Sequence, residues 1–459
     1  MTVTPSLAST SSVPQTASRK LQGYEFYREV LGSPKYIVAP MVDQSELAWR
    51  RLSRRYGAEL AYTPMINAKM FAGSHHKGYR EQAFNTALGE EGGPGDRPLI
   101  VQFCANDPDK LLASARVLEP HCDAIDINLG CPQDIAKKGR YGSYLQDDWE
   151  LIYKLINTLH LNLSIPVTAK FRVFPSVEKT VEYAKMLERA GAQILTCHGR
   201  TREQRGHNTG LADWAKIRAV KNAVSVPVFT NGNILYHRDI EQCLVETGAD
   251  GVMSAEGQLY NAALFAPSLS TIPRLSSSTS HDPTSSSGDT GLHPPHARLA
   301  LEYLQIVDSL KTPTPLSAVK GHLFKIMRPA LAKEPDLREK MGRIRGGDGK
   351  GLKPYFEIVE EMVRRMDRDE KEAAESGECG DVEMIPHWLA QPYFRPLPAP
   401  ATEVETEAAV KNKAISPGIS KRPHSERTPD SDIDVEDDAK RTKLDIVAEN
   451  SAPPAVVCG

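Results

Sequence analysis

Short apolar runs recur eight times in the first part of this 459-residue chain, and each interval between them leaves room for a helix. Strands that alternate with helices pair in parallel through right-handed crossovers. Eight such units close a (β/α)8 TIM barrel, whose chemistry collects at the carboxyl ends of the strands. An open doubly wound sheet is the alternative, but its Gly-x-Gly-x-x-Gly would follow the first run, where Ala39-Pro-Met-Val42 stands. The predicted strands are 36–39, 60–63, 99–103, 124–128, 167–171, 194–198, 228–231 and 251–254.

Changes in composition divide the rest of the chain. Residues 268–296 are dominated by Ser, Thr, Pro and His, a composition that cannot bury enough apolar surface to offset the entropy lost on ordering. Apolar residues then recur at helical spacing, at 297–308, 318–331 and 355–366, which predicts a smaller all-helical domain. The predicted parts are a disordered start (1–22), the barrel (23–267), a disordered insertion (268–296), the helical domain with a short extended end piece at 388–395 (297–395) and a disordered tail (396–459).

The composition also bears on location and partners. No apolar run approaches eighteen residues and the start lacks the apolar core of a secretory signal, so we expect no membrane partner. Seven scattered cysteines without Cys-x-x-Cys spacing favour reduced thiols and no metal site. We expect a monomer in the cytoplasm, the nucleus or both. Two basic clusters, Lys421-Arg422 and Lys440-Arg-Thr-Lys443, resemble a bipartite import signal, although solubilising charge explains them equally well.

A cysteine follows the fourth predicted strand. The apolar run 124–128 stops at Gly130 and Pro132, so Cys131 lies on a tight turn at the end of a buried strand. A thiol held there can reach a ligand that lies across the strand end. The alternative is that Cys131 packs as a small hydrophobic residue.

Other polar residues end neighbouring predicted strands, namely Gln102, Asn128, Lys170, His198 and Asn231. Burying an unpaired ammonium costs several kcal/mol, so an inward-pointing Lys170 needs an anion or a carbonyl. The alternative to a ligand contact is a structural ion pair inside the barrel, for which Asp126 on the adjacent strand is the candidate partner. Arg172, two residues on, is expected to leave toward the rim. His198 is either a ligand contact or a hydrogen-bonded core residue. Together these residues predict a pocket for a flat ligand that carries a phosphate.

The last two predicted strands end in Thr230-Asn-Gly-Asn233 and Ser254-Ala-Glu-Gly257. Barrels commonly build a phosphate site there, where helix amino termini point their N–H groups and positive dipole ends into the mouth. Gly232 and Gly257 would let the backbone approach the phosphate closely, although a glycine taken alone more often belongs to an ordinary turn.

Six motifs in this order and spacing resemble the tRNA-dihydrouridine synthases. They are Ala39-Pro-Met-Val42, Asn128-Leu-Gly-Cys-Pro132, Lys170-Phe-Arg172, His198-Gly-Arg-Thr201, Asn231-Gly-Asn233 and Ala255-Glu-Gly257. The run Tyr141-Gly-Ser-Tyr-Leu145 and residues 198–214 resemble the eukaryotic branch that modifies tRNA positions 16 and 17.

The resemblance implies FMN at the barrel mouth, NADPH or NADH as reductant, and a helical domain that grips tRNA. It assigns Pro40, Met41 and Val42 to the face of the flavin ring, and Gln102 and Lys170 to its polar edge. It assigns the phosphate to His198, Asn231, Gly232, Asn233, Ala255, Glu256 and Gly257. Many relatives have an arginine where Glu256 stands, and an acid is unfavourable beside a phosphate, so we expect this side chain to point away. Asn128, Arg172, Arg200 and Thr201 are the expected substrate contacts at the mouth.

The implied chemistry is a hydride from flavin N5 to C6 of a uracil, with a proton from Cys131 to C5. A thiol of ordinary pKa, near 8.5, is mostly protonated at neutral pH, as a general acid must be. The target base must also be splayed out of the RNA stack to reach the pocket.

RNA binding requires a cationic surface. Residues 320–353 contain ten Lys and Arg against four Asp and Glu. Lys320, Lys325 and Arg328, with Phe324, fall within three turns of one predicted helix and would form a basic stripe, although an ordinary solvated helix face is the alternative. Two other functions stay open, a flavin-dependent barrel that reduces a free pyrimidine or an enone, and a non-catalytic RNA-binding protein.

Overall fold

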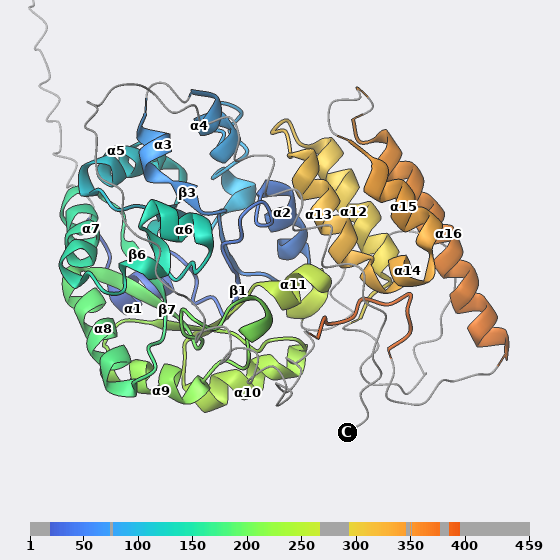
Figure 1. Ribbon diagram of the computed structural model, residues 1–459. Coiled ribbons are helices and arrows are strands. Elements are labelled where there is room, and N and C mark those ends of the chain that lie inside the picture. Colours follow the sequence, from blue (N-terminus) through green and yellow to red (C-terminus); the bar gives the residue numbers. More distant parts are fainter. Residues whose placement is uncertain are drawn as a thin grey trace, which may run out of the picture. The chain divides into compact units, whose positions relative to one another are not determined.

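The computed structural model describes residues 19–73, 77–266, 293–345, 349, 351–376 and 385–394. The predictions for 1–18, for most of the insertion (268–292) and for the tail, including both basic clusters, lie outside these residues. Figure 1 shows the arrangement of the described elements.

Within the described residues, eight parallel strands close a barrel, which confirms the predicted fold. The ring closes because β1 pairs with both β2 and β9, and β2 pairs with β4. A short strand that was not predicted, β3 (Ile66–Asn67), pairs with the outer end of β4. The barrel strands are β1 (Tyr36–Val38), β2 (Leu60–Tyr62), β4 (Leu99–Cys104), β5 (Ala124–Leu129), β6 (Val167–Arg172), β7 (Ala192–His198), β8 (Val228–Asn231) and β9 (Gly251–Ser254).

Helices follow the strands and surround the barrel (Figure 1). Their starts are capped as the sequence allows: Asp107 accepts hydrogen bonds from the first turn of α5, and Ser176 and Asp213 cap α8 and α9 in the same way. None of the described helices is long and apolar enough to cross a membrane. The helices of this part are α1 (Gly23–Glu29), α2 (Leu47–Arg55), α3 (Ala68–Ala72), α4 (Lys77–Ala83), α5 (Pro108–Leu118), α6 (Asp134–Gly139), α7 (Trp149–Asn162), α8 (Val177–Ala190), α9 (Trp214–Ala223), α10 (His237–Thr247) and α11 (Glu256–Tyr260).

The region after the barrel is helical, as predicted, but its basic stripe does not lie on one helix. Lys320 and Lys325 belong to α13, which ends at Ile326, whereas Arg328 begins α14. The reason is Pro329, which is tolerated in a first helical turn but not in a helix interior. The helices here are α12 (His296–Ser309), α13 (Leu316–Ile326), α14 (Arg328–Lys333), α15 (Pro335–Arg343) and α16 (Lys353–Ser376).

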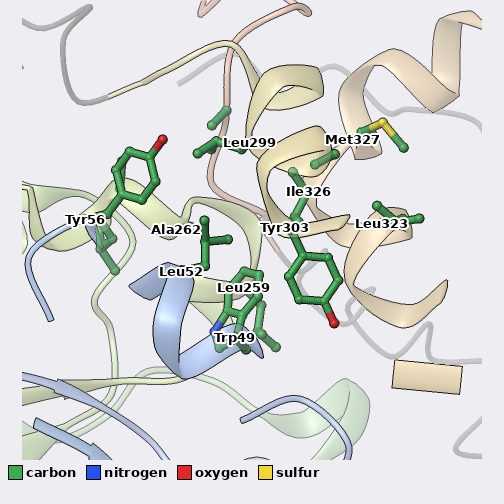
Figure 2. Packing of buried hydrophobic residues seen from close by; sticks show 14 of the residues in the cluster. Trp49, Leu52, Tyr56, Leu259, Ala262, Leu299, Tyr303, Leu323, Ile326 and Met327 are labelled. Carbon is green, nitrogen blue, oxygen red and sulfur yellow. The ribbon is translucent and has the colours of Figure 1, made fainter. Parts of the chain in front are cut away.

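The helical region shares one continuous hydrophobic core with the barrel. Figure 2 shows Trp49 and Leu52 of α2 close to Leu259 of α11, with Tyr303 of α12 and Leu323 of α13 beside them. A buried polar cluster reinforces this packing. The His322 ring stacks on Trp49 with centroids 4.1 Å apart, while its Nε2 lies 3.0 Å from Oε2 of Glu46, and the Tyr303 hydroxyl donates to Oε1 of Glu46 at 2.7 Å.

Two predicted boundaries are displaced by long-range contacts. Lys20, which we expected in the disordered start, donates to the carbonyl oxygens of His160 and Leu163 at 2.8 and 3.1 Å. His293, which we expected in the insertion, has its Nδ1 2.7 Å from the carbonyl oxygen of Ala390, in the extended end piece. These contacts join segments far apart in sequence, so the composition of either segment does not reveal them.

Candidate active site

Cys131 lies two residues beyond β5, on a turn that its own neighbours hold in place. Oδ1 of Asn128 accepts hydrogen bonds from the backbone N–H groups of Gly130 and Cys131, at 3.1 and 2.9 Å. The carbonyl oxygen of Cys131 accepts from both the backbone N–H and the hydroxyl of Ser143, at 3.0 and 2.9 Å. The thiol therefore sits on a backbone that is fixed on both sides.

Gly142 allows the second of these contacts. Its φ is +64°, and a methyl group at this position would lie 2.7 Å from the carbonyl oxygen of Cys131 and 3.0 Å from its Cβ. Glycine is the residue that tolerates this conformation and this approach. The Tyr141-Gly-Ser segment is thus part of the Cys131 turn.

Burial raises the pKa of the Cys131 thiol, an effect that the backbone at Gln133 and the charges of Arg172 and Lys170 oppose. The thiol is consequently protonated at neutral pH. This is the state that a proton donor requires, and it does not favour a nucleophilic role.

A chain of buried polar side chains runs from the barrel interior to this turn. The Thr168 hydroxyl and Nε2 of Gln102 donate to Asp126, at 2.6 and 2.8 Å. Oε1 of Gln102 accepts from Nδ2 of Asn128 at 2.8 Å. Asn128 in turn accepts from the Cys131 turn, so the position of the thiol is linked to the interior of β4, β5 and β6.

Lys170 makes no direct ion pair with Asp126, the candidate partner in the alternative of a structural ion pair. The strand register places Asp126 opposite Thr168, whereas Lys170 lies opposite Asn128, one inward-facing level closer to the mouth. The Lys170 ammonium instead donates to Oδ1 of Asn231 on β8 at 2.9 Å. Burial, and secondarily the charge of Arg172, lowers the pKa of Lys170 to about 8. The negative charge of Asp126 opposes this shift without a direct contact. A desolvated ammonium in hydrogen-bond contact with a neutral amide is suited to an electron-rich ligand edge.

His198 and Arg200 lie together beside the ends of β7 and β8. The guanidinium of Arg200 is 3.3 Å from Nε2 of His198 and donates to Oδ1 of Asn233 at 3.0 Å. Burial, together with the charges of Lys170, Arg172 and Arg200, holds the pKa of His198 well below its usual value. The imidazole is neutral, and the net positive charge around it favours an anion.

The two glycines at the predicted phosphate site are required by close packing. Gly232 has φ +117°, and a methyl group there would lie 2.6 Å from Cβ of Ala212. A methyl group at Gly257 would lie 2.2 Å from the carbonyl oxygen of Ile234. Near Gly257, the buried hydroxyl of Ser254 has no hydrogen-bond partner among the described residues, which fits a position that a bound ligand would complete.

Comparison with known proteins identifies the family of this chain. The sequence profile described as Dihydrouridine synthase (Dus) matches residues 37–353. The chain belongs to the dihydrouridine synthase family. It is 46% identical over 399 residues to the tRNA-dihydrouridine(16/17) synthase [NAD(P)(+)] of Schizosaccharomyces pombe, covering 84% of this chain and 93% of that protein. It is 45% identical over 400 residues to the enzyme of the same name in Saccharomyces cerevisiae, covering 84% and 89%.

More distant family members match less of the chain. The human tRNA-dihydrouridine(20a/20b) synthase [NAD(P)+]-like protein is 40% identical over 233 residues, which cover 50% of this chain and 70% of that protein. The similarity to the two yeast (16/17) proteins thus extends well beyond the part that the family shares with the (20a/20b) branch.

Arg172, which we expected to contact substrate, connects two loops of the protein itself. Arg172 donates through Nε to the carbonyl oxygen of Gly130 at 2.8 Å. Its Nη1 donates to the carbonyl oxygens of Thr201 and Gln204, at 2.8 and 3.0 Å. It therefore ties the Cys131 turn to the loop after β7.

Of the flavin-facing residues, Val42 is 51% exposed at the mouth, and the backbone N–H of Met41 donates to the Ser45 hydroxyl.

The predicted RNA-binding cations also have partners within the protein. Lys320 donates to the carbonyl oxygens of Gly342 and Ile344, at 2.6 and 3.0 Å. The guanidinium of Arg328 lies 4.0 Å from the centre of the Tyr393 ring, in the extended end piece.

Lys325 connects the helical region to the barrel mouth. Its ammonium donates at 2.9 Å to Oε1 of Gln44, in the loop that follows Pro40, Met41 and Val42. Burial lowers the pKa of Lys325, and the negative charge of Glu256 opposes this effect. The charge of Glu256 thus acts on the helical region.

Sequence reasoning missed the supporting roles of Asp126, Thr168, Gly142 and Ser143. The signal for the last two was present, because Tyr141-Gly-Ser-Tyr-Leu145 was part of the family resemblance. This run indicates the branch of the family and, in the structure, also forms part of the Cys131 turn.

Proposed function

We propose that this protein reduces uridine to 5,6-dihydrouridine in the D-loop of tRNA, at positions 16 and 17, with NADPH or NADH as the reductant and FMN as the cofactor. The observation that carries the proposal is a braced, protonated thiol beside cationic strand ends, in a chain 45–46% identical over most of its length to tRNA-dihydrouridine(16/17) synthases. Membrane and metal play no part in it, and the protein acts as a monomer in the cytoplasm, the nucleus or both.

The residues at the mouth fit FMN. Lys170 and Gln102 would hold the polar edge of the ring, and Pro40, Met41 and Val42 would back its face. The phosphate would lie against the backbone of Asn231, Gly232, Asn233, Ala255 and Gly257, near His198, with Arg200 adding positive charge. The unpartnered Ser254 hydroxyl supports this placement. When bound and reduced, FMN supplies a hydride to C6 of the uracil.

Cys131 supplies the other hydrogen. The thiol donates its proton to C5 of the ring, so that the C5–C6 double bond becomes a single bond and a thiolate is left, which recovers a proton from solvent. The raised pKa keeps the donor protonated at neutral pH. Asn128 holds the turn that aims the thiol, and we propose that its remaining amide hydrogen meets the uracil edge.

We propose Arg172, Arg200 and Thr201 as substrate contacts at the rim, with Arg172 using the Nη2 group that its loop contacts leave over. In the helical region we propose Lys320, Lys325 and Arg328, which would contact RNA while they keep the internal partners described above. The charge excess of residues 320–353 supports the second group, since phosphate contacts dominate RNA affinity. The target base must leave its stack to reach the mouth.

The test compares the wild-type protein with Cys131→Ala. The purified wild type should be yellow, release FMN and convert uridine in unmodified tRNA. Cys131→Ala should keep its FMN and its reduction by NADPH, yet form little dihydrouridine in a single turnover. Cys122→Ala, which removes a buried thiol remote from the mouth, is the matched control and should convert normally.

Each alternative has its own outcome. Conversion of free uridine as fast as tRNA would favour a reductase of free pyrimidines. Tight tRNA binding by a colourless protein that FMN cannot reconstitute would favour a non-catalytic RNA-binding protein. Near-normal product from Cys131→Ala would remove the thiol from the mechanism.

A further inference from the structure

A separate pocket of about 320 Å³ lies beside the mouth, at the carboxyl ends of β4 and β5. It is formed by the start of α3, the end of β4, the start of α5 and the end of α6. None of the residues assigned above to cofactor or substrate lines this pocket. Its volume is that of a small-ligand site, and the reaction as described leaves it without a role.

The pocket is strongly cationic. Its lining includes Lys69, Lys110, Lys138 and Arg140, and Asp107 is the one carboxylate among its lining residues. The ion pair of Lys110 with Asp107 is long, 3.8 Å, and both side chains are close to half exposed, so it neutralises little of the excess. Lys138 also acts on Asp134, whose pKa it helps to lower, so it is left out of the count. The other three cations against Asp107 still leave two surplus positive charges, whose mutual repulsion a bound polyanion would relieve.

The inner wall of the pocket touches the proton donor. Cys104 and Tyr141 line the pocket and belong to the same small apolar cluster as Cys131. Tyr141 also immediately precedes Gly142, where an added methyl group would meet the carbonyl oxygen of Cys131 at 2.7 Å. One layer of side chains therefore separates the cationic pocket from the thiol.

We propose that this pocket binds a backbone phosphate of the tRNA nucleotide next to the uridine that is reduced. The proposal rests on the function proposed above. A uridine splayed into the mouth keeps phosphodiesters on both sides, and the strand must continue past Cys131. Phosphate on the dinucleotide reductant offers the same chemistry, but it has no need of a site on the far side of the thiol.

The order of strands around the barrel supports the RNA strand as the ligand. The helical region meets the mouth at the loop after β1, through Gln44, and beside Glu256, which follows β9. Around the ring, β5 lies opposite β9, whereas β2 alone lies between β4 and β1. The pocket and the basic helical region thus meet the mouth at different places along its rim, so an RNA strand that contacts both would pass over the mouth.

The experiment compares two double variants of the full-length protein. Lys110→Ala with Lys138→Ala removes two lining charges, from α5 and α6. Arg116→Ala with Lys137→Ala removes two exposed charges from the same helices outside the pocket. The Kd of unmodified tRNA is measured from 50 to 300 mM salt. The rate of flavin reduction is measured separately, over a range of NADPH and NADH concentrations.

The pocket variant should bind tRNA about tenfold more weakly near physiological salt. The slope of its log Kd against log salt should be smaller than that of the wild type by about two, one for each cation removed. FMN content and flavin reduction should match the wild type, and the control variant should change both binding quantities by clearly less. Equal losses in the two variants, or slower flavin reduction with unchanged tRNA binding, would overturn the proposal. Failure of the proposed function would show differently, as absence of dihydrouridine with the wild-type protein.

Discussion

Replacement of Gly142 by alanine is the most direct test of how the Cys131 turn is held. The residue has φ +64°, in the left-handed region, and a methyl group would come within 2.7 Å of the carbonyl oxygen of Cys131. That oxygen belongs to backbone that Ser143 and Asn128 already fix, so it cannot move without breaking hydrogen bonds.

Two costs add in Gly142→Ala. The left-handed conformation costs an alanine about 1–2 kcal/mol. Forcing a methyl group into a filled space costs about 1–3 kcal/mol more. The free energy of unfolding should therefore fall by about 2–5 kcal/mol. A thiol displaced by about 1 Å should slow the proton transfer about 100-fold.

Gly89→Ala is the matched control. Gly89 has φ +71°, but nothing lies within 4 Å of the position that its methyl group would take. The free energy of unfolding of Gly89→Ala should fall by about 1–2 kcal/mol, from the backbone conformation alone. This variant should form dihydrouridine at the normal rate.

The measurements are urea unfolding and single-turnover conversion of tRNA by the pre-reduced enzyme, with FMN content as the check on folding. FMN content should be unchanged, because the glycine motifs after β8 and β9 are not touched. Equal losses of stability in the two variants, with normal product from Gly142→Ala, would refute the argument that this glycine positions Cys131.

Two further predictions concern the lysines at the mouth. The folded-state pKa of Lys170, about 8, is below the ordinary 10.5, so the unfolded chain binds more protons between these values. The stability of the FMN-free protein should therefore rise with pH across that window; Lys170→Met should flatten the rise and weaken FMN binding, as unfolding curves at several pH values and fluorescence titration would reveal. Replacing Lys325 and Gln44 by alanine, singly and together, should give a coupling energy of about 1–3 kcal/mol in unfolding free energy, and strict additivity would count against their contact.

The fold was predictable because the apolar runs repeat at one interval and each is bounded by polar or turn residues. All eight predicted strands are present, and the helical region follows them. The break at Pro329 could also be predicted, since proline interrupts a helix interior. The apolar spacing, which continues across this residue, instead predicts one uninterrupted helix. The hydrogen bond from Lys20 to the carbonyl oxygen of His160 could not be predicted from the sequence, because the two residues are 140 positions apart.

The site was predictable in its position and less so in its contacts. In a parallel barrel every strand end faces the same opening, so Lys170, His198 and Asn231 had to converge. Which neighbour each side chain meets depends on register, and a shift of one level separates Asp126 from Lys170. Arg172 shows the same limit, because the carbonyl groups that it binds belong to loops whose course no pattern in the sequence describes.

The direction of the hydrogen bonds in the barrel explains why an acid stands at Asp126. Every link donates toward it: Gln102 donates to Asp126, Asn128 donates to Gln102, and the turn of Cys131 donates to Asn128. Burial raises the pKa of Asp126 to about 6, so at neutral pH it is ionised and only accepts. An acceptor at the start of the chain orients both amide groups, and Asn128 consequently presents its oxygen, not its NH2 group, to the backbone of Cys131. A buried carboxylate on the strand that ends in the thiol thus determines the conformation of the turn that aims it.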